Sequence, residues 1–309
     1  MQHLVNLKPA DRHLLEFLQR TGRRLNCRLY LVGGTVRDIL LGYENWDLDI
    51  VGVGNTSLVA KAIQKKFPVK IIAYPRFGTF VVNQGPDADR QHWFDLATAR
   101  GERYKYPGAL PEVFPVKRIE DDLGRRDFTI NALALSLDVL ARQGWRVFSD
   151  EDVIDCFAGR SDLAKRILRI IKPDSFSEDP TRIFRASRFV YRFGLKLSSA
   201  TSKALNQSRK NLPLISPARR YQEIKYILLE KNPARVFQIL RRWHLLEYLV
   251  AEKPHLLKLF LNYPDADFSG ADYGQRLKIF WRIDKKMSEE FSRFFEIPRA
   301  LRVIGRAPD

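Results

Sequence analysis

The stretch LYLVGGTVRDILLGYENWDLDIVG, residues 29–52, decides the fold of the first part of the chain. A first apolar run ends in two glycines, a segment with helical spacing follows, and a second apolar run contains two aspartates. Short apolar runs bounded by glycine are typical of strands, so the order predicts strand, glycine turn, helix and strand. The pattern raises the question of why a strand destined for the protein interior carries two carboxylates.

The two aspartates of this strand are Asp47 and Asp49. Side chains two residues apart on a strand point to the same face, about 7 Å from each other. Trp46, Leu48 and Ile50 are then expected on the opposite face, where they can be buried. Two neighbouring anions repel unless water solvates them or a cation neutralises them, and hard oxygen ligands in this arrangement suit Mg²⁺. Taken alone, the pair is more simply explained as the solvated face of an edge strand.

The double glycine Gly33-Gly34 lies directly upstream, before a helix that is expected to open at about Thr35. Glycines let a backbone approach a phosphate closely, and a helix N-terminus offers free N–H groups. Arg37 in the first turn can add a guanidinium to the same anion. A glycine turn is usually only structural, but followed by the two aspartates it indicates a nucleoside triphosphate site with a metal beside it.

The stretch GRRDFTINALA, residues 124–134, is predicted to form a helix capped by Asp127 or Thr129. The apolar residues expected to anchor this helix to the core are Phe128, Ile130, Leu133 and Ala134. Arg125 and Arg126 precede the helix. Because paired arginines are often only surface charge, they indicate an anion site here through their context alone.

The stretch SEDPTRIFRASRFVYRFG, residues 177–194, is predicted to form a helix with one apolar side. Its expected core residues are Ile183, Ala186, Val190 and Phe193. The residues on the adjacent arc are Arg182, Arg185, Arg188 and Arg192. Aligned arginines repel one another, so the pattern favours an anion facing them, with a solvated basic face as the alternative.

Asp179 lies one turn before Arg182, on the same side of the predicted helix. A carboxylate only accepts hydrogen bonds and a guanidinium only donates them. Cytosine and adenine present an exocyclic amine beside a ring-nitrogen acceptor, whereas guanine and uracil present a carbonyl beside an N–H. A fixed pair of this kind can accept C and A and reject G and U without a template, since mispairing costs about 1–3 kcal/mol per unsatisfied buried group.

The charge of the 309-residue chain is uneven, and its length allows two or three domains. Residues 1–155 hold 22 Lys and Arg against 20 Asp and Glu, whereas residues 156–309 hold 31 against 16. A basic second half predicts a polyanionic partner such as nucleic acid, with a solvated surface as the alternative. No apolar run approaches the roughly 20 residues that span a bilayer, and the N-terminal segment is typical of an amphipathic helix, not a signal peptide. We expect a cytoplasmic protein without a membrane partner.

The secondary-structure pattern changes near residue 150. VKIIAY (69–74), GTFVVNQ (78–84) and HWFDLAT (92–98) predict strands, whereas helical spacing dominates after residue 155. The fold class is therefore α+β, a mixed head followed by an all-helical region. The two cysteines of the chain predict neither a disulfide framework nor a zinc cluster.

The motifs LVGGTVRDILLG, DLD, RRDFTINALA, IDCFAGRSDL, EDPTRIFRASRF and ISPARRYQEI together resemble, in order and spacing, the class II tRNA nucleotidyltransferase and bacterial poly(A) polymerase family. The resemblance runs from about residue 28 to 250. It implies a polymerase-β-like nucleotidyltransferase head at 1–150, a helical neck for base recognition at 151–215, and a helical body with a short tail for tRNA binding at 216–309. The tail is expected to be short because the chain ends earlier than most such proteins.

The resemblance also implies an activity and its residues. The reaction would be template-independent, Mg²⁺-dependent nucleotide addition to the tRNA 3′ acceptor end, from ATP and, in CCA-adding members, CTP, with release of pyrophosphate. One metal would lower the pKa of the primer hydroxyl, and another would stabilise the leaving pyrophosphate. Asp47 and Asp49 match the metal ligands, and Asp95 matches a third carboxylate near the metals. The positions expected to bind the nucleotide are Gly33, Gly34, Arg37, Arg126, Asn131, Asp179, Arg182, Arg185 and Arg188, of which Asp179 and Arg182 match the base-reading pair.

The sequence leaves the added nucleotide open between A alone and C, C and A. Residues 99–113 occupy the place of a flexible loop that helps to switch specificity, and their PGALP resembles the A-adding branch. However, FVYRFG (189–194) stands where A-adding relatives usually show FEQRFG. Two other functions are considered: a poly(A) polymerase with the same chemistry, and a catalytically silent RNA-binding protein. The sequence does not indicate the oligomeric state.

Overall fold

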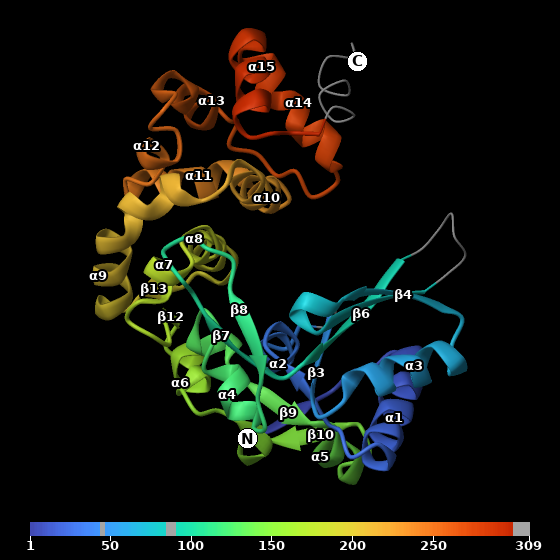
Figure 1. Cartoon of the computed structure of the whole chain (residues 1–309). Coiled ribbons are helices and arrows are strands. Elements are labelled where there is room, and N and C mark those ends of the chain that lie inside the picture. Colours follow the sequence, from blue (N-terminus) through green and yellow to red (C-terminus); the bar gives the residue numbers. More distant parts are fainter. Residues whose placement is uncertain (44–46, 85–90, 299–309) are drawn as a thin grey trace. The chain divides into compact units, whose positions relative to one another are not determined.

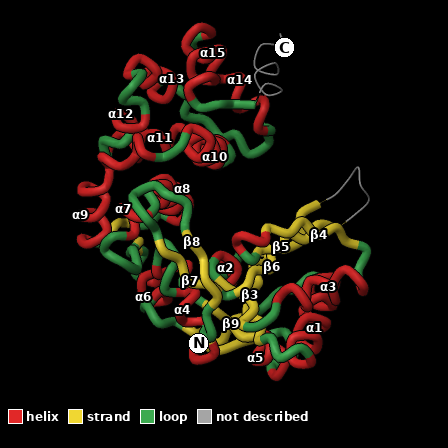
Figure 2. Tube along the Cα trace, in the orientation of Figure 1, coloured by secondary structure: helices red, strands yellow, loops and turns green. Residues whose placement is uncertain are grey.

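The computed structural model describes residues 1–43, 47–84 and 91–298. The chain divides into two compact units. Unit 1 comprises Met1–Arg103 and Pro111–Lys165, and unit 2 comprises Tyr104–Leu110 and Arg166–Asp309. Unit 1 mixes helices and strands, whereas the described part of unit 2 is helical except for one pair of two-residue strands (Figures 1 and 2). The expected α+β fold class, with a mixed head followed by a helical region, is confirmed.

A seven-stranded mixed sheet forms the centre of unit 1, in the order β11-β9-β2-β3-β6-β5-β4. Its strands are β2 (Arg28–Val32), β3 (Leu48–Val53), β4 (Val69–Tyr74), β5 (Thr79–Gln84), β6 (Gln91–Thr98), β9 (Ala134–Ser136) and β11 (Val153–Ile154). β3 and β6 run parallel, and the other neighbouring pairs are antiparallel. The strands predicted at 69–74, 78–84 and 92–98 are confirmed as β4, β5 and β6.

Helices α1 and α3 pack against the sheet and against each other. The remaining elements of unit 1 are β1 (Gln2–Leu4), α1 (Pro9–Arg24), α2 (Gly34–Leu40), α3 (Thr56–Lys66), η1 (Pro75–Phe77), β7 (Arg100–Arg103), β8 (Glu112–Pro115), α4 (Ile119–Leu123), η2 (Thr129–Asn131), α5 (Leu137–Arg142), β10 (Val147–Ser149), η3 (Asp150–Asp152) and α6 (Gly159–Ala164). Leu48 and Ile50 are buried in the core, as predicted, and Trp46 lies outside the described residues. Residues 2–4 form a strand, so the N-terminal helix starts only at Pro9.

The prediction of a helix over residues 124–134 is wrong. This segment forms one 3-10 turn, η2, and then enters strand β9, which pairs with both β2 and β11. The four apolar residues predicted to face the core are indeed fully buried: Phe128, Ile130, Leu133 and Ala134. A helix or strand is recognised in sequence by the alternation of a buried and an exposed face, and burial on every side removes that alternation. In addition, pairing of β9 with two strands outweighs the local preference for helix.

Unit 2 is built around helix α8, which packs against α10 and α11. Its elements are β12 (Ile167–Leu168), α7 (Ser175–Glu178), α8 (Thr181–Phe193), β13 (Lys196–Leu197), α9 (Ser199–Ser208), η4 (Arg209–Leu214), α10 (Pro217–Leu228), α11 (Pro233–Arg242), α12 (Leu246–Leu249), η5 (Pro254–Leu256), α13 (Leu257–Leu261), α14 (Tyr273–Ile283) and α15 (Lys285–Phe294). Ser216 and Asn232 cap α10 and α11, whose first residues are prolines. The pair β12–β13 was not predicted, since two residues carry no readable period.

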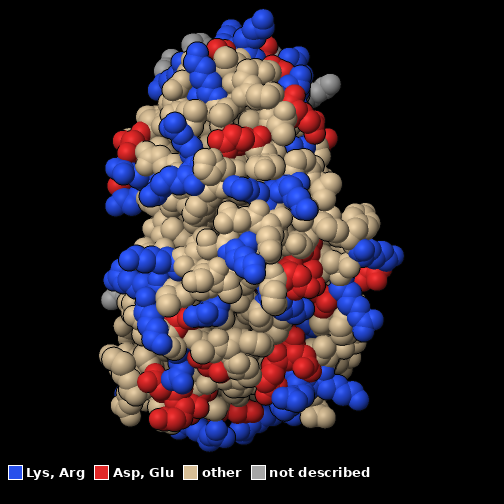
Figure 3. Space-filling model, turned by 90° about the vertical axis from the view of Figure 1, so that its left-hand side faces the viewer, with Lys and Arg blue, Asp and Glu red and all other residues tan. Residues whose placement is uncertain are grey.

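Figure 3 shows how charge is spread over one face of the molecule. Lys and Arg side chains form several separate groups on this face, with Asp and Glu between them. On this face the Lys and Arg side chains are therefore not gathered into a single patch. None of the helices in the described part of the chain has both the length and the apolar character that crossing a bilayer requires.

Candidate active site

The glycine turn between β2 and α2 brings backbone close to the acidic strand. Gly33 has a φ of 62°, in the left-handed region that glycine adopts without strain. A Cβ at Gly33 would lie 2.5 Å from Nη1 of Arg126, and a Cβ at Gly34 would lie 3.7 Å from Oδ2 of Asp49. The turn, Arg126 and Asp49 are therefore immediate neighbours, and at Gly33 only glycine leaves room for the guanidinium.

Thr35, a residue that the sequence analysis missed as a site residue, fixes the backbone of both aspartates. Its hydroxyl donates to the carbonyl of Asp47 at 2.6 Å and accepts from the backbone N–H of Asp49 at 2.8 Å. The sequence analysis placed Asp47 within a strand. Strand β3 begins only at Leu48, so Asp47 stands just before it. The exposed Asp47 is thus held by a buried hydroxyl group, while Asp49 belongs to the sheet.

The carboxylate of Asp49 is half-buried, with two further acids and two arginines around it. Burial raises its pKa to about 6; Arg126 and Arg37 lower the pKa, whereas Asp95 and Asp47 raise it. Asp95 lies directly opposite Asp49 in the parallel ladder of β3 and β6. A half-buried carboxylate beside other acids offers the hard oxygen donors that suit a divalent cation.

A metal at these acids would not be enclosed by protein alone. In the described residues, no three side chains of His, Cys, Asp or Glu converge into a complete metal site. Mg²⁺ is commonly held by one or two carboxylates and completes its shell with water and substrate phosphates. The open arrangement of the acids fits this mode of binding.

Arg37 and Asn131 belong to one buried hydrogen-bond network. Nη1 of Arg37 donates to Oδ1 of Asn131 at 2.6 Å, and its Nε and Nη2 donate to Asp38 at 2.8 and 3.0 Å. Nδ2 of Asn131 donates to Oδ1 of Asp127 at 3.0 Å. Arg37 is only 5% exposed, so its guanidinium is fixed in place. The structure thus brings the predicted Gly33, Gly34, Arg37, Arg126 and Asn131 together around Asp49.

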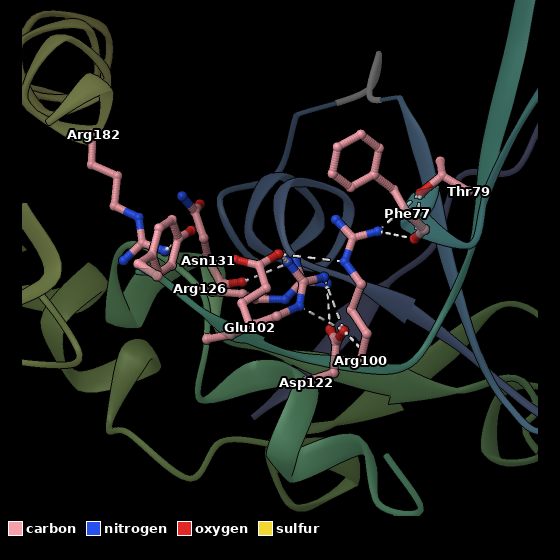
Figure 4. Close-up of polar contacts among 10 residues, drawn as sticks. Phe77, Thr79, Arg100, Glu102, Asp122, Arg126, Asn131 and Arg182 are labelled. Atoms are coloured by element: carbon pink, nitrogen blue, oxygen red, sulfur yellow. Dashed lines mark hydrogen bonds and ion pairs between the residues drawn. The ribbon is translucent and has the colours of Figure 1, made fainter. Parts of the chain in front are cut away.

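Arg126 is held by Asp122, which the sequence analysis did not single out (Figure 4). Asp122 is fully buried and accepts from Nη2 of Arg126 at 3.1 Å, from Nε of Arg125 at 3.0 Å and from the backbone N–H of Arg100 at 3.1 Å. Burial raises the pKa of Asp122, but Arg126 and Arg125 outweigh burial and hold it below its ordinary value. In the sequence, the acidic run shortly before Arg125 and Arg126 was the signal that could have identified Asp122.

The network continues from Asp122 through Arg125 and Arg100 to one further charged residue, Glu102. Nη1 of Arg125 donates to Oε1 of Glu102 at 2.7 Å, and Nε of Arg100 donates to the same oxygen at 3.4 Å. The guanidinium of Arg100 also donates to Oγ1 of Thr79 at 3.0 Å and to the carbonyl of Phe77 (Figure 4). Three guanidinium groups in this network face two carboxylates, so it keeps positive charge beside the glycine turn.

His92 is a further residue that the sequence analysis missed. The register between β5 and β6 shifts at Val82 and Asn83, which makes Trp93 an extra residue in β6. A bulge of this kind re-aims side chains. As a result Nε2 of His92 lies 3.0 Å from Oδ1 of Asp95, and both side chains are 42% exposed.

Asp179 lies in unit 2, between α7 and α8. Its Oδ1 accepts from the backbone N–H of Thr181 at 3.1 Å, from the Thr181 hydroxyl at 2.7 Å and from Nη2 of Arg219 at 2.7 Å. Nη1 of Arg219 donates to the carbonyl of Gly108 at 2.9 Å. Arg219, which stands in the quoted motif ISPARRYQEI but was not assigned a role, therefore fixes the carboxylate and the 104–110 segment together.

Arg182, the second member of the predicted pair, is nearly buried at 6% exposure. Its Nη1 donates to the hydroxyl of Ser175 at 2.7 Å, and its Nη2 donates to the hydroxyl of Tyr104 at 3.4 Å. The guanidinium also lies 5.8 Å from the centre of the Tyr104 ring. Arg182 is thus oriented by two hydroxyl groups, and a solvated basic face does not describe it.

The other arginines of α8 differ in their surroundings. Arg188 and Arg192 share Glu230, which is 4% exposed, through Nε of Arg188 at 3.0 Å and Nη2 of Arg192 at 2.6 Å. Arg185 lies over the ring of Phe189 at 5.5 Å. The expected anion opposite the arginine arc is therefore supplied in part by the protein itself, from a residue 42 positions away in the sequence.

Similarity to known proteins extends over both units. A family described as "Poly A polymerase head domain" matches residues 29–169, and one described as "Probable RNA and SrmB- binding site of polymerase A" matches residues 194–259. The A-adding tRNA nucleotidyltransferase of Aquifex aeolicus is 38% identical over 264 residues, which cover 80% of this chain and 30% of that protein. The CC-adding tRNA nucleotidyltransferase of Deinococcus radiodurans is 35% identical over 242 residues, covering 77% of this chain and 60% of that protein.

Solved structures of related proteins are similar to this chain in fold. A CCA-adding enzyme in an apo form matches with a TM-score of 0.71 and 31% identity, over 97% of this chain and 71% of that one. The chain spans less than two thirds of the length of the two curated relatives.

Proposed function

We propose that this chain, which belongs to the class II tRNA nucleotidyltransferase and bacterial poly(A) polymerase family, adds the 3′-terminal A, or C, C and A, to tRNA without a template. Its substrates would be ATP, CTP in the CCA-adding case, and the tRNA 3′ acceptor end. One observation carries the proposal: in unit 1 the glycine turn and Arg126 stand directly beside Asp49. Donors for a triphosphate and acids for a cation are thereby adjacent.

The proposed division of labour follows the chain. Residues 1–150 would be the catalytic head, residues 151–215 the neck that recognises the base, and residues 216–309 the body and short tail that bind tRNA. The excess of Lys and Arg after residue 155 supports this order, because phosphate contacts supply much of the affinity for nucleic acid. The proposed substrate places the reaction in the cytoplasm.

The family generally uses a divalent metal, and in this chain we propose Mg²⁺ held by Asp47 and Asp49, with Asp95 beside them. A bound Mg²⁺ would neutralise charge on the triphosphate and lower the pKa of a coordinated hydroxyl. The role of Thr35 would be to fix the spacing of the two acids through their backbones. The position of the half-buried Asp49 opposite Asp95 in the strand ladder supports the assignment, since it places carboxylate oxygens side by side.

The residues proposed to bind the nucleotide belong to both units. The residues proposed to hold its triphosphate are Gly33, Gly34, Arg37, Arg126 and Asn131. In unit 2, Asp179 and Arg182 would read the Watson–Crick edge of the base, with Arg185 and Arg188 as further contacts. Support comes from the fixed geometry of the pair: Arg219 holds Asp179, and two hydroxyl groups hold Arg182.

An end-group assay with three RNAs tests the proposal. The protein is incubated with Mg²⁺ and either ATP, CTP or both, on tRNA lacking CCA, tRNA ending in CC, and oligo(A). One adenylate on tRNA ending in CC, with no addition to tRNA lacking CCA, identifies A addition, and three nucleotides on tRNA lacking CCA identify CCA addition. Long tracts on oligo(A) would instead identify a poly(A) polymerase. Absence of transfer to all three RNAs would reject the enzyme and leave RNA binding alone.

A further inference from the structure

The outer part of the unit 1 sheet exposes apolar side chains. In β4, Ile72 is 41% exposed and Tyr74 is 48% exposed. Because they are two residues apart on one strand, both point to the same face. A solvent-facing side of an antiparallel sheet is normally polar, and neighbouring exposed apolar side chains mark binding surfaces.

The strand register connects this surface with the candidate active site. Asp49 of β3 pairs with Asp95 of β6, Asp95 pairs with Val81 of β5, and Val81 pairs with Ile72 of β4. Directly paired residues of neighbouring strands project from the same face of a sheet. The four side chains therefore form one row, which starts at the acids and ends at the edge strand.

A second row runs beside the first. Ala97 of β6 pairs with Thr79 of β5, and Thr79 pairs with Tyr74 of β4. We call the surface made by Ile72, Tyr74, Thr79 and Val81 the outer sheet face. Its edge also carries the exposed Lys70, two residues from Ile72 on the same face.

The opposite side of the same strands is the core of unit 1. Leu48, Phe94 and Val82, which are paired across β3, β6 and β5, are 2%, 0% and 0% exposed. Apolar residues on that side are accounted for by packing. On the side of the acids, Ile72 and Tyr74 are exposed and Val81 is half-buried, so packing leaves part of this apolar surface uncovered.

The acids separate two surfaces of different chemistry. On the β2 side lie the glycine turn and Arg126, which offer N–H donors and positive charge. On the β5 and β4 side lies the outer sheet face, whose Ile72, Tyr74 and Val81 are apolar and whose Thr79 accepts a hydrogen bond from Arg100. Nucleotidyl transfer brings two reactants to the acids, a triphosphate and a hydroxyl roughly in line with the leaving group. The donor-rich side suits the triphosphate, which leaves the apolar side for the molecule that carries the hydroxyl.

We propose that the outer sheet face binds the 3′-terminal nucleosides of the acceptor RNA. This inference rests on the proposed function. The Tyr74 ring offers a stacking surface for a base, Ile72 and Val81 offer apolar contact for the ribose and base, and Lys70 lies within the same face for a phosphate. The terminal hydroxyl is then directed along the row toward Asp95, where His92 donates or accepts the 3.0 Å hydrogen bond.

Steady-state kinetics with three variants test this inference. Tyr74→Ala and Ile72→Ser are expected to raise the KM for tRNA lacking its terminal nucleotide by about tenfold, through loss of stacking and apolar contact, and to leave the KM for ATP within about twofold. The matched control is Ala73→Ser, an exposed neighbour on the opposite face of β4. Both test positions are exposed, so the fold should survive, and circular dichroism melting checks this. An unchanged RNA KM in both variants would overturn the inference.

A crosslinking experiment decides the same point without catalysis. tRNA carrying 4-thiouridine at its 3′ end is irradiated with the unmodified full chain, and the modified peptide is identified by mass spectrometry. Attachment within residues 70–81 supports the inference, and attachment confined to other segments overturns it. Failure of the unmodified protein to add nucleotides would reject the proposed function, whereas active enzyme with attachment elsewhere would reject only the outer sheet face. If Tyr74→Ala and Ile72→Ser lose self-association but keep RNA binding, the outer sheet face is a protein interface. That result would also overturn the inference.

Discussion

The acidic centre of unit 1 and the arginine centre of unit 2 handle buried charge in opposite ways. Burial raises the pKa of Asp49 to about 6, and the acids Asp95 and Asp47 raise it further against Arg126 and Arg37. In unit 2, Arg188 and Arg192 share the buried Glu230, and Arg219 pairs with Asp179. The first centre gains stability from an added cation, whereas the second is compensated by protein groups. Substitutions in the first should therefore act on chemistry, and substitutions in the second on selectivity and stability.

The largest effect is expected from Asp49→Asn. The amide keeps the shape of the side chain but loses the charge that would hold Mg²⁺, so nucleotide incorporation should fall by roughly 10³-fold. Affinity for tRNA, measured by filter binding, should stay within a few-fold, because phosphate contacts elsewhere supply it. If the variant incorporates nucleotides about as fast as the unmodified protein, the acidic centre does not depend on a bound cation. The contrast with the arginine centre would then be wrong.

Asp122→Asn should have the next largest effect. Its amide would point a donor at guanidinium groups that now donate to a carboxylate, and Arg126 would lose its fixed position. Loss of one charged hydrogen bond predicts a fall of roughly 10- to 100-fold in kcat/KM for ATP. The matched control is Asp121→Asn, which changes an exposed neighbour.

A double-mutant cycle sharpens this prediction. If Asp122 acts through Arg126, the double variant Asp122→Asn/Arg126→Ala should be no slower than Arg126→Ala alone. Additive losses in kcat/KM would show that Asp122 acts on folding or through Arg125 instead. Melting temperatures of all three variants separate these two cases.

The parts of the fold that could be predicted are those whose residues determine their own local structure. The glycine turn, β4, β5, β6 and helix α8 follow from Gly33, from alternating apolar residues and from a 3.6-residue period. Residues 124–134 failed because burial on all sides and pairing with β2 and β11 override local preference. Asp47 was placed inside a strand that starts one residue later, since boundaries depend on neighbours such as Thr35.

The site residues show the same limit. Residue types and spacing pointed to Asp49, Arg37, Arg126 and Asn131, which the structure brings together. Their partners could not be read in this way, because Glu230 lies 42 residues from Arg188. A bulge that turns His92 toward Asp95 likewise has no local signature in the sequence. Pattern reading finds chemical groups, and tertiary structure decides what holds them.

In the arginine centre, Arg182→Ala should alter selection more than rate. Removal of the guanidinium takes away the donor proposed to face the base, so the preference for ATP over GTP should fall about tenfold. Competition assays with mixed nucleotides on tRNA ending in CC measure the ratio. Arg241→Ala, on an exposed position of α11, is the control and should leave the ratio unchanged. Unchanged discrimination in Arg182→Ala would show that this centre is structural.

The smallest effect is expected from Glu223→Gln, and it appears in stability. Burial raises the pKa of Glu223 to about 7, although Arg185 and Arg188 lower it, and its Oε2 has no hydrogen-bond partner among the described residues. A carboxyl whose folded pKa is raised contributes stability that is fully present below its unfolded pKa near 4.5 and is lost as the pH rises to about 7.

Glutamine stays neutral at every pH, so the variant should be more stable than the unmodified protein at pH 8, by ~1–2 kcal/mol. The difference should shrink toward zero as the pH falls to about 4.5. Thermal melts from pH 4.5 to 8 measure it, with the exposed Glu247→Gln as the control. A variant that is less stable at pH 8 would mean that Arg185 and Arg188 need the charged carboxylate of Glu223. The positive and negative charges of the arginine centre would then be matched more closely than the hydrogen bonds indicate.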